Sequence, residues 1–128
     1  MVAWTEYKER AKERGALALE LFVVMSTPGD KSEAVRDTLP KHLAYQREQE
    51  IAGRLVLAGP MLDESGEQMI GAGLIVYRAP TMSDAREIAD NDPMHKSGAR
   101  TYILRKWLVN EGSLNISVGL STGKSQIS

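Results

Sequence analysis

The sequence contains no cysteine. That absence excludes disulfide bonds, thiolate catalysis, and zinc or iron–sulfur sites built on cysteine ligands. No apolar run approaches the about 20 residues that a membrane-spanning helix needs. The N-terminal residues are charged and mixed, without the apolar centre of a signal peptide. We therefore expect a cytoplasmic protein without a membrane partner.

Aromatic residues and net charge are also scarce. Aromatic side chains make up 5% of the chain, and 16 Lys and Arg residues oppose 17 Asp and Glu residues, for a formal net charge of -1. Such a chain has no strong positive field to attract nucleic acid. An RNA-recognition domain would share the strand order derived below, but it stacks bases on aromatic residues of its sheet. We expect no nucleic-acid partner.

The composition is otherwise that of a globular protein. The 128 residues are 42% hydrophobic and 26% charged, which suits one domain with a real core. Hydrophobic periodicity and turn residues predict a helix followed by the order βαββαβ. The predicted elements are a helix in 1–15, strands in 17–25, 54–60, 70–78 and 101–109, helices in 32–53 and 81–89, and a short turn of helix in 94–99.

Proline, turn residues and a capping motif help to define where these elements begin and end. Pro40 interrupts the helical pattern of residues 32–53, so either a helix starts near Pro40 or a longer helix kinks there. Residues 26–30 are predicted to form a turn after the first strand. Thr81 and Asp84 match a capping box and predict a helix N-terminus.

The predicted order gives an α+β, ferredoxin-like fold, with an antiparallel sheet and both helices on one face. We place an N-terminal helical extension in 1–15, this domain in 16–110 and a C-terminal tail in 111–128, either a hairpin or loosely ordered. The other sheet face would be left open to water or aggregation. Pairing two sheets face to face covers it, so we expect a homodimer.

Several segments in order resemble the YCII-related family. The segment LPKHLAY (39–45) contains the pattern Pro-x-His-Leu, and GRLVLAGP (53–60) contains Gly-Arg-Leu and Ala-Gly-Pro. Asp92-Pro93-Met94 resembles the Asp-Pro-aromatic segment of that family, and Trp107 is an aromatic residue near the end of the closing strand. The resemblance covers roughly residues 17–109.

This resemblance implies a dimeric α+β barrel, related to muconolactone isomerase and to antibiotic-biosynthesis monooxygenases. One characterised activity in the family is the dehydrochlorination of a chlorinated hydroxyhydroquinone. The family is thought to use a histidine with an acidic partner, in the cleft between helix and sheet. Where many members have an aspartate after the first strand, this sequence has Ser26 and Thr27. Met94 replaces the usual aromatic residue.

His42 is the main catalytic candidate. Helical spacing from Leu39 and Gln46 places it on or beside the inward stripe of its helix, and an imidazole there can exchange a proton near neutral pH. The alternative is a structural histidine bonded to a backbone carbonyl. Asp92 either orients that imidazole or serves only as a turn residue before Pro93. The resemblance favours a catalytic pair of His42 and Asp92.

Other residues are candidate ligand contacts, each with a structural alternative. Hydroxyl groups at the end of the first strand can hydrogen-bond a ligand or form a turn, and a glycine can admit a ligand to the backbone or turn the chain. A second histidine is either a pocket group or a solvated turn residue. Arg54 and Arg100 can pair with an anionic substrate or serve as surface charges without a specific role. The predicted ligand contacts are Ser26, Thr27, Gly59, Pro60, Met94 and His95.

Together these observations predict a small-molecule enzyme of the isomerase or lyase type. It would catalyse proton transfer, by isomerisation or elimination, on a cyclic phenol, quinol or lactone. No cofactor is expected, because proton abstraction beside a carbonyl needs a base and a stabilised oxyanion. The two histidines and Asp92 lack HxH or HExxH spacing, so no metal site is expected. The alternatives are a non-catalytic ligand-binding dimer and a cofactor-free monooxygenase.

Overall fold

The computed structural model describes residues 1–69 and 71–128, which form two compact units. Residues 20–108 make one unit, and residues 1–19 with 109–128 make the other. The larger unit follows the order βαββαβ, with a 3₁₀ turn at Ser32–Ala34. Its main elements are β1 (Leu19–Pro28), α2 (Val35–Ile51), β2 (Leu55–Pro60), β3 (Gly73–Tyr77), α3 (Met82–Asn91), α4 (Pro93–Lys96) and β4 (Arg100–Val109).

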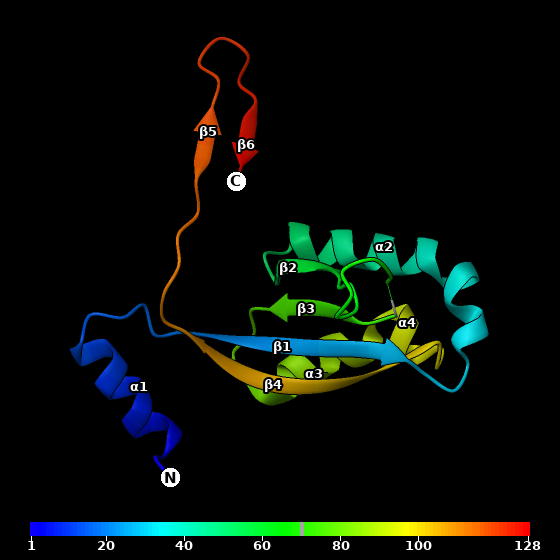
Figure 1. The fold of residues 1–128 in the computed structure, drawn as a ribbon, viewed down its shortest axis with the longest axis horizontal. Helices are drawn as coiled ribbons and strands as arrows, with labels where there is room; N and C mark the ends of the chain where they lie inside the picture. The colour runs from blue at the N-terminus through cyan, green and yellow to red at the C-terminus, as the bar shows by residue number, and fades with distance from the viewer. Residues whose placement is uncertain (70) are drawn as a thin grey trace. The chain divides into compact units, whose positions relative to one another are not determined.

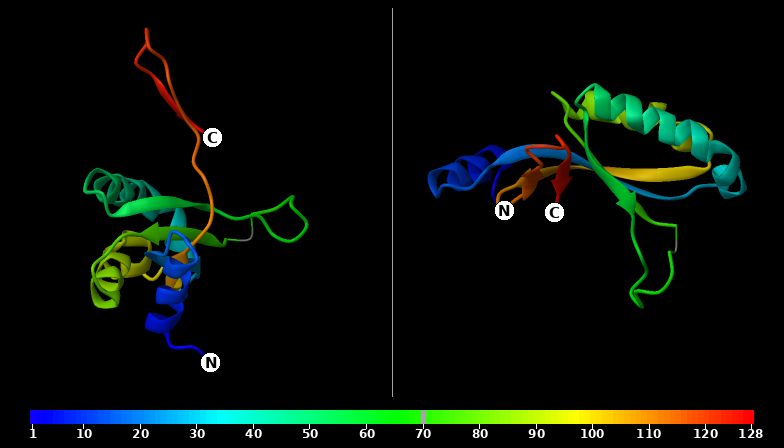
Figure 2. Two further views of the ribbon diagram at one scale, coloured as in Figure 1. Left: turned by 90° about the vertical axis from the view of Figure 1, so that its left-hand side faces the viewer. Right: turned by 90° about the horizontal axis from the view of Figure 1, so that it is seen from above.

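The four strands form one sheet in the order β2-β3-β1-β4. Strand β3 runs antiparallel to both β1 and β2, and Phe22 lies opposite Tyr77 in the β1–β3 register. Helices α2 and α3 cover the same face of this sheet (Figures 1 and 2). The chain is therefore an α+β protein with a ferredoxin-like fold, as the sequence predicts.

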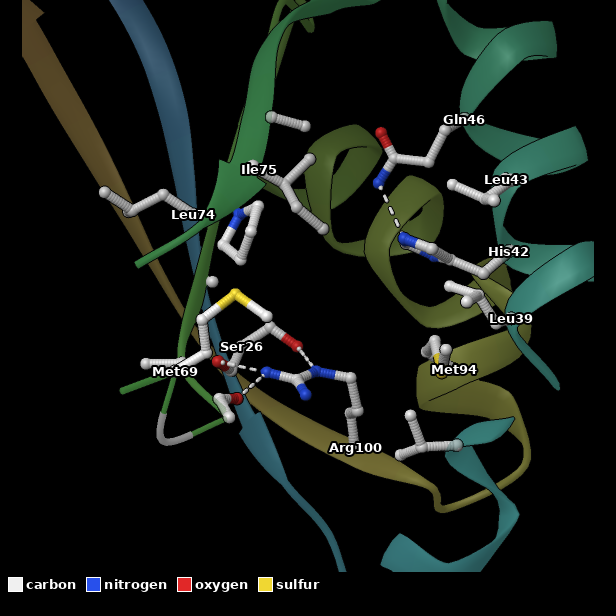
Figure 3. Close-up of a pocket in the computed structure, with 17 residues that line it drawn as sticks. Ser26, Leu39, His42, Leu43, Gln46, Met69, Leu74, Ile75, Met94 and Arg100 are labelled. Atoms are coloured by element: carbon white, nitrogen blue, oxygen red, sulfur yellow. Dashed lines mark hydrogen bonds between the residues drawn. The ribbon is translucent and has the colours of Figure 1, made fainter. Parts of the chain in front are cut away.

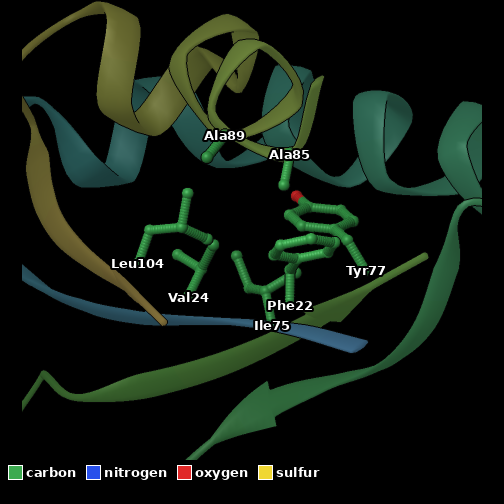
Figure 4. Close-up of a cluster of buried hydrophobic side chains, with 7 residues drawn as sticks. All are labelled: Phe22, Val24, Ile75, Tyr77, Ala85, Ala89 and Leu104. Carbon is green, nitrogen blue, oxygen red and sulfur yellow. The ribbon is translucent and has the colours of Figure 1, made fainter. Parts of the chain in front are cut away.

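The core lies between this sheet face and α3 (Figure 4). Alternate strand positions point inward, because successive side chains of a strand face opposite sides. The helix contributes alanines, whose small side chains let it approach the sheet closely. Burying one large apolar side chain stabilises a fold by about 1.5–3 kcal/mol. The core cluster consists of Phe22, Val24, Ile75, Tyr77, Ala85, Ala89 and Leu104.

The ends of two strands differ from the prediction. Strand β1 continues to Pro28, so residues 26–28 are strand and not the predicted turn. Ser26 pairs with Gly73 in the ladder, and its hydroxyl is buried with polar partners described below. Strand β3 starts only at Gly73, because Gly71 has a φ of +64°, a left-handed conformation outside the extended region. The predicted strand start at Ile70 lies outside the described residues.

Helix α2 passes through Pro40 without ending. It starts at Val35, so the second of the two predicted alternatives, a longer helix that includes Pro40, is the one that forms. A proline inside a helix removes one backbone hydrogen bond, and the remaining turns and their packing on the sheet keep the helix together. The capping box is confirmed, since the Thr81 hydroxyl accepts a 3.1 Å hydrogen bond from the backbone N–H of Asp84.

The smaller unit contains the two ends of the chain. Helix α1 (Trp4–Glu13) stops before Gly15, whose φ of +84° is easily adopted only by glycine. Strands β5 (Ile116–Val118) and β6 (Ser125–Ile127) pair as an antiparallel hairpin, the ordered one of the two predicted states for the tail. The predicted domain boundaries at residues 15 and 110 stay predictions. Across the described ranges, no helix has both the length and the apolar character to cross a membrane.

Candidate active site

A largely apolar cavity of about 540 Å³ lies between α2 and the sheet in the larger unit (Figure 3). Its volume is typical of small-molecule sites, which usually carry a few polar groups on apolar walls. Four polar side chains reach it: Ser26, His42, Gln46 and Arg100. The remaining lining residues are Val35, Leu39, Leu43, Ala58, Gly59, Pro60, Met69, Gly71, Ala72, Gly73, Leu74, Ile75 and Met94.

His42 and Asp92 form a hydrogen-bonded pair at this cavity. The Nδ1 atom of His42 lies 2.8 Å from Oδ1 and 2.9 Å from Oδ2 of Asp92. The Asp92 side chain is completely buried, whereas that of His42 retains 18% of its surface. The carboxylate therefore holds the imidazole from behind, while the ring faces the cavity.

The partners of the ring determine which nitrogen carries the proton. A carboxylate only accepts hydrogen bonds, so Nδ1 of His42 donates to Asp92. In the neutral ring, Nε2 is then the free base. The Gln46 amide nitrogen lies 3.4 Å from this Nε2, close to the upper limit for a hydrogen bond (Figure 3). A substrate can displace so long a contact, which leaves Nε2 able to take a proton from it.

The position of Asp92 follows from its local sequence. It is the N-cap of α4, and Pro93 occupies the first helical position, where a proline loses no helical hydrogen bond. Its Oδ1 also accepts a 2.9 Å hydrogen bond from the backbone N–H of Met94. A buried carboxylate needs such donors to stay charged. The cap thus fixes the carboxylate at the point where α2 presents His42.

A second polar chain links β1, β4 and the segment around α4. Arg100 Nε donates to Ser26 Oγ at 2.8 Å, and Ser26 Oγ lies 3.0 Å from His95 Nε2. His95 Nδ1 donates to the backbone carbonyl of Ala89 at 2.8 Å, so its Nε2 accepts from the Ser26 hydroxyl. Gly29 lets the segment after β1 lie close to the backbone before β4, because a Cβ there would lie 2.5 Å from the Gly98 carbonyl oxygen. The hydroxyl of Ser26 thus donates to His95 and accepts from Arg100.

The electrostatic state of His95 agrees with its contacts. Burial is the main cause that lowers the pKa of His95, and the hydrogen bond to Ala89 and the nearby Asp92 only partly oppose it. The ring is therefore neutral near pH 7, as its accepting Nε2 requires. His95 also packs on Tyr102, with ring centroids 4.7 Å apart. His95 is therefore a paired, partly buried residue, and the predicted alternative of a solvated turn residue is wrong.

The predicted site residues do not all reach the cavity. Ser26, His42, Gly59, Pro60 and Met94 line it, and Asp92 lies directly behind His42. Thr27 is exposed and is not a lining residue, because it follows Ser26 in the strand and points to the opposite face. His95 is not among the lining residues, but it hydrogen-bonds to Ser26, which is one of them.

Other residues of the cavity were not selected from the sequence. Gln46 is one helical turn after His42, and that i,i+4 spacing was the available signal for its contact. Met69 and Leu74 come from β3 and the segment before it, and nothing in their spacing marks them as site residues. Of the two candidate arginines, Arg100 lines the cavity, whereas Arg54 donates to Gln49 in another hollow.

Potential metal ligands do not cluster in the described chain. Within residues 1–69 and 71–128, no three His, Asp or Glu side chains converge as a metal site would require. The imidazoles of His42 and His95 instead use their Nδ1 atoms on Asp92 and on a backbone carbonyl.

Comparisons with known proteins agree with this architecture. The fold is similar to that of 5-chloro-2-hydroxyhydroquinone dehydrochlorinase (TftG) from Burkholderia phenoliruptrix AC1100, solved in complex with 2,5-dihydroxybenzoquinone. The TM-score is 0.57 at 20% sequence identity, covering 68% of this chain and 92% of that one. No curated protein sequence matches significantly. Residues 20–108 match the YCII-related domain. The chain therefore belongs to the YCII-related family.

Proposed function

We propose that the protein is a small-molecule enzyme that isomerises, or eliminates a leaving group from, a cyclic phenol, quinol or lactone. One observation carries the proposal: the buried carboxylate of Asp92 holds His42 with its Nε2 atom toward an apolar cavity. In this role His42 is the general acid or base and Asp92 orients it. Such groups typically contribute about 10²–10⁴-fold to a rate.

An elimination at this site balances without a redox partner. Nε2 of His42 takes a proton from the substrate, the released electron pair moves into the ring, and a chloride or similar group leaves with the electrons of its bond. The net result is loss of HCl, with no external oxidant. An isomerisation differs only in the last step, since the protonated imidazole returns the proton to another atom. The likeness to TftG, a dehydrochlorinase by name, supports the elimination.

The test is an assay of the purified protein with 5-chloro-2-hydroxyhydroquinone and with unsaturated lactones. Chloride release, product absorbance and oxygen uptake are followed together, without added cofactor. We expect chloride release or isomerised lactone with no oxygen uptake beyond that of the substrate alone, because hydroxyhydroquinones autoxidise in air. Oxygen uptake that depends on the protein would instead show a monooxygenase. Saturable binding without any product would show a ligand-binding protein and would remove the proposed reaction.

We also propose that the protein is a homodimer that pairs through the open sheet face. Side chains of this face alternate with the core positions, and four of them keep between 37% and 62% of their surface exposed. They form an apolar surface opposite the helices, which a second copy of the sheet can cover. The four residues are Met25, Leu57, Ile103 and Trp107.

Light scattering at micromolar concentration tests this assembly. The wild-type protein should have the mass of two chains, and Ile103→Glu should shift it to one chain. Met82→Glu is the matched control, because Met82 is also exposed but starts α3 on the other side of the sheet. A monomeric wild-type protein would contradict the proposed dimer.

A further inference from the structure

We infer that Arg100 is the anion-binding group of the cavity and that the substrate is a ring compound carrying a negative oxygen, as an enolate, phenolate or carboxylate. This inference rests on the proposed function, since it names the substrate class for the same cavity. The proposed roles of His42 and Asp92 concern proton transfer and do not say which charge the substrate carries. Arg100 places a cation in a mostly apolar cavity.

The guanidinium of Arg100 is held rigidly but is only partly used. Its Nε donates to Ser26 Oγ, and its Nη2 donates to the backbone carbonyls of Ser26 and Gly71. Within residues 1–69 and 71–128, Nη1 has no hydrogen-bond partner. Figure 3 shows the guanidinium at the cavity with these bonds on one side. A fixed plane with a spare donor is preorganised for an oxygen anion.

Arg100 also has no salt-bridge partner among the described residues. Asp92 is near enough to favour the charged guanidinium, but its oxygens are occupied by His42 and the Met94 N–H. Burial lowers the pKa of Arg100, yet a guanidinium remains protonated in proteins. A partly buried cation that no carboxylate contacts directly has a desolvation cost, which direct contact with an anionic ligand offsets.

The other candidate arginine, Arg54, is placed differently from Arg100. Its Nε donates to the Gln49 side chain, and it lines a different hollow, which His42 does not line. Arg100 instead shares one cavity with His42, which reaches it from α2 while Arg100 comes from β4. In the elimination, His42 takes the proton while charge develops on a ring oxygen. A cation at that oxygen stabilises the transition state.

Binding of charged and neutral ring pairs tests the inference by calorimetry. One pair is 2,5-dihydroxybenzoquinone, which is ionised at neutral pH, and its neutral dimethoxy ether. The other pair is benzoate and benzamide, so that an enolate can be distinguished from a carboxylate. The proteins are wild type, Arg100→Gln, Arg100→Lys and the control Arg36→Gln. Arg36 is exposed on α2 and does not line the cavity, so this control removes the same charge.

We expect the wild-type protein to prefer the anion of at least one pair. Arg100→Gln should weaken binding of that anion by about ten- to hundredfold and leave its neutral partner unchanged. Arg100→Lys should keep part of the preference, because it keeps the charge but loses the fixed plane. It also covers the case in which Arg100→Gln fails to fold. Arg36→Gln should bind as the wild type does.

Two results would overturn the inference: equal affinity of wild type for charged and neutral rings, or an unchanged anion preference in both Arg100 variants. A failure of the proposed reaction can be distinguished from a failure of this inference. His42→Asn should still prefer the anion, because the cation is intact, and should lose turnover. A protein that prefers anions through Arg100 but turns over no substrate keeps the binding group and loses the proposed chemistry.

Discussion

The two histidines of the chain lie in adjoining regions but have different hydrogen-bond partners. His42 donates to the buried carboxylate of Asp92 and keeps its other nitrogen toward the cavity. His95 donates to a backbone carbonyl and accepts from Ser26, so both of its nitrogens are used within the protein. The two rings thus differ in the partner of Nδ1 and in whether Nε2 is bonded within the protein or faces the cavity. A carboxylate supports a proton acceptor, whereas a carbonyl with burial supports a neutral structural ring.

The largest effect that this comparison predicts is on turnover. His42→Asn should lower kcat by about 10²–10⁴-fold, because asparagine cannot exchange a proton near neutral pH. The melting temperature should also fall, because the buried carboxylate of Asp92 loses its imidazole partner, so kcat is measured at a temperature where the variant is folded. His95→Asn is the matched variant, and it should mainly lower the melting temperature. Full activity of a folded His42→Asn protein would remove the proposed role of His42.

A smaller loss is expected when the carboxylate behind His42 is changed. Asp92→Asn keeps an oxygen to accept from the Met94 N–H but loses the charge that fixes the His42 ring. We expect kcat to fall by about 10–100-fold, less than for His42→Asn, because the base itself remains. Steady-state kinetics of the two single variants and the double variant measure this. Losses that multiply in the double variant would show that Asp92 does not act through His42.

The smallest effect concerns the pH dependence of stability and His95. Burial lowers the pKa of His95 in the folded protein below its unfolded value of about 6.5. As pH falls below that value, the unfolded chain binds a proton that the folded chain does not, so stability decreases toward acid. The contribution of one group is at most about 1.4 kcal/mol per pH unit.

His95→Gln should make the stability curve flatter between pH 7 and pH 5. Glutamine can keep one hydrogen bond in that space but does not titrate. Urea unfolding of wild type and variant at several pH values measures the difference. Arg36→Gln is a control, because it changes an exposed residue and leaves His95 in place. Parallel curves for wild type and His95→Gln would show that His95 is not the neutral buried ring described here.

Much of the fold was predictable because its signals are local. The capping residues Thr81 and Asp84, the apolar strand residues around Phe22, and the Asp92-Pro93 pair each specify a short piece of backbone. Pro40 left two alternatives open, a helix start or a longer helix, and the longer helix forms because helical packing over many residues outweighs one missing hydrogen bond. Ser26 misled the prediction, because its turn propensity yields to pairing with Gly73 and to partners far along the chain.

The sequence by itself determined the βαββαβ order, the candidates His42 and Asp92, and the lack of any strong net charge. Only the tertiary structure decided which histidine faces the cavity and which is closed off. The same holds for Arg100, which was one of two equivalent arginines in the sequence. Its spare nitrogen depends on residues 74 and 29 positions away, at Ser26 and Gly71. Periodicity and capping act over a few residues, whereas hydrogen bonding and desolvation depend on groups that only folding brings together.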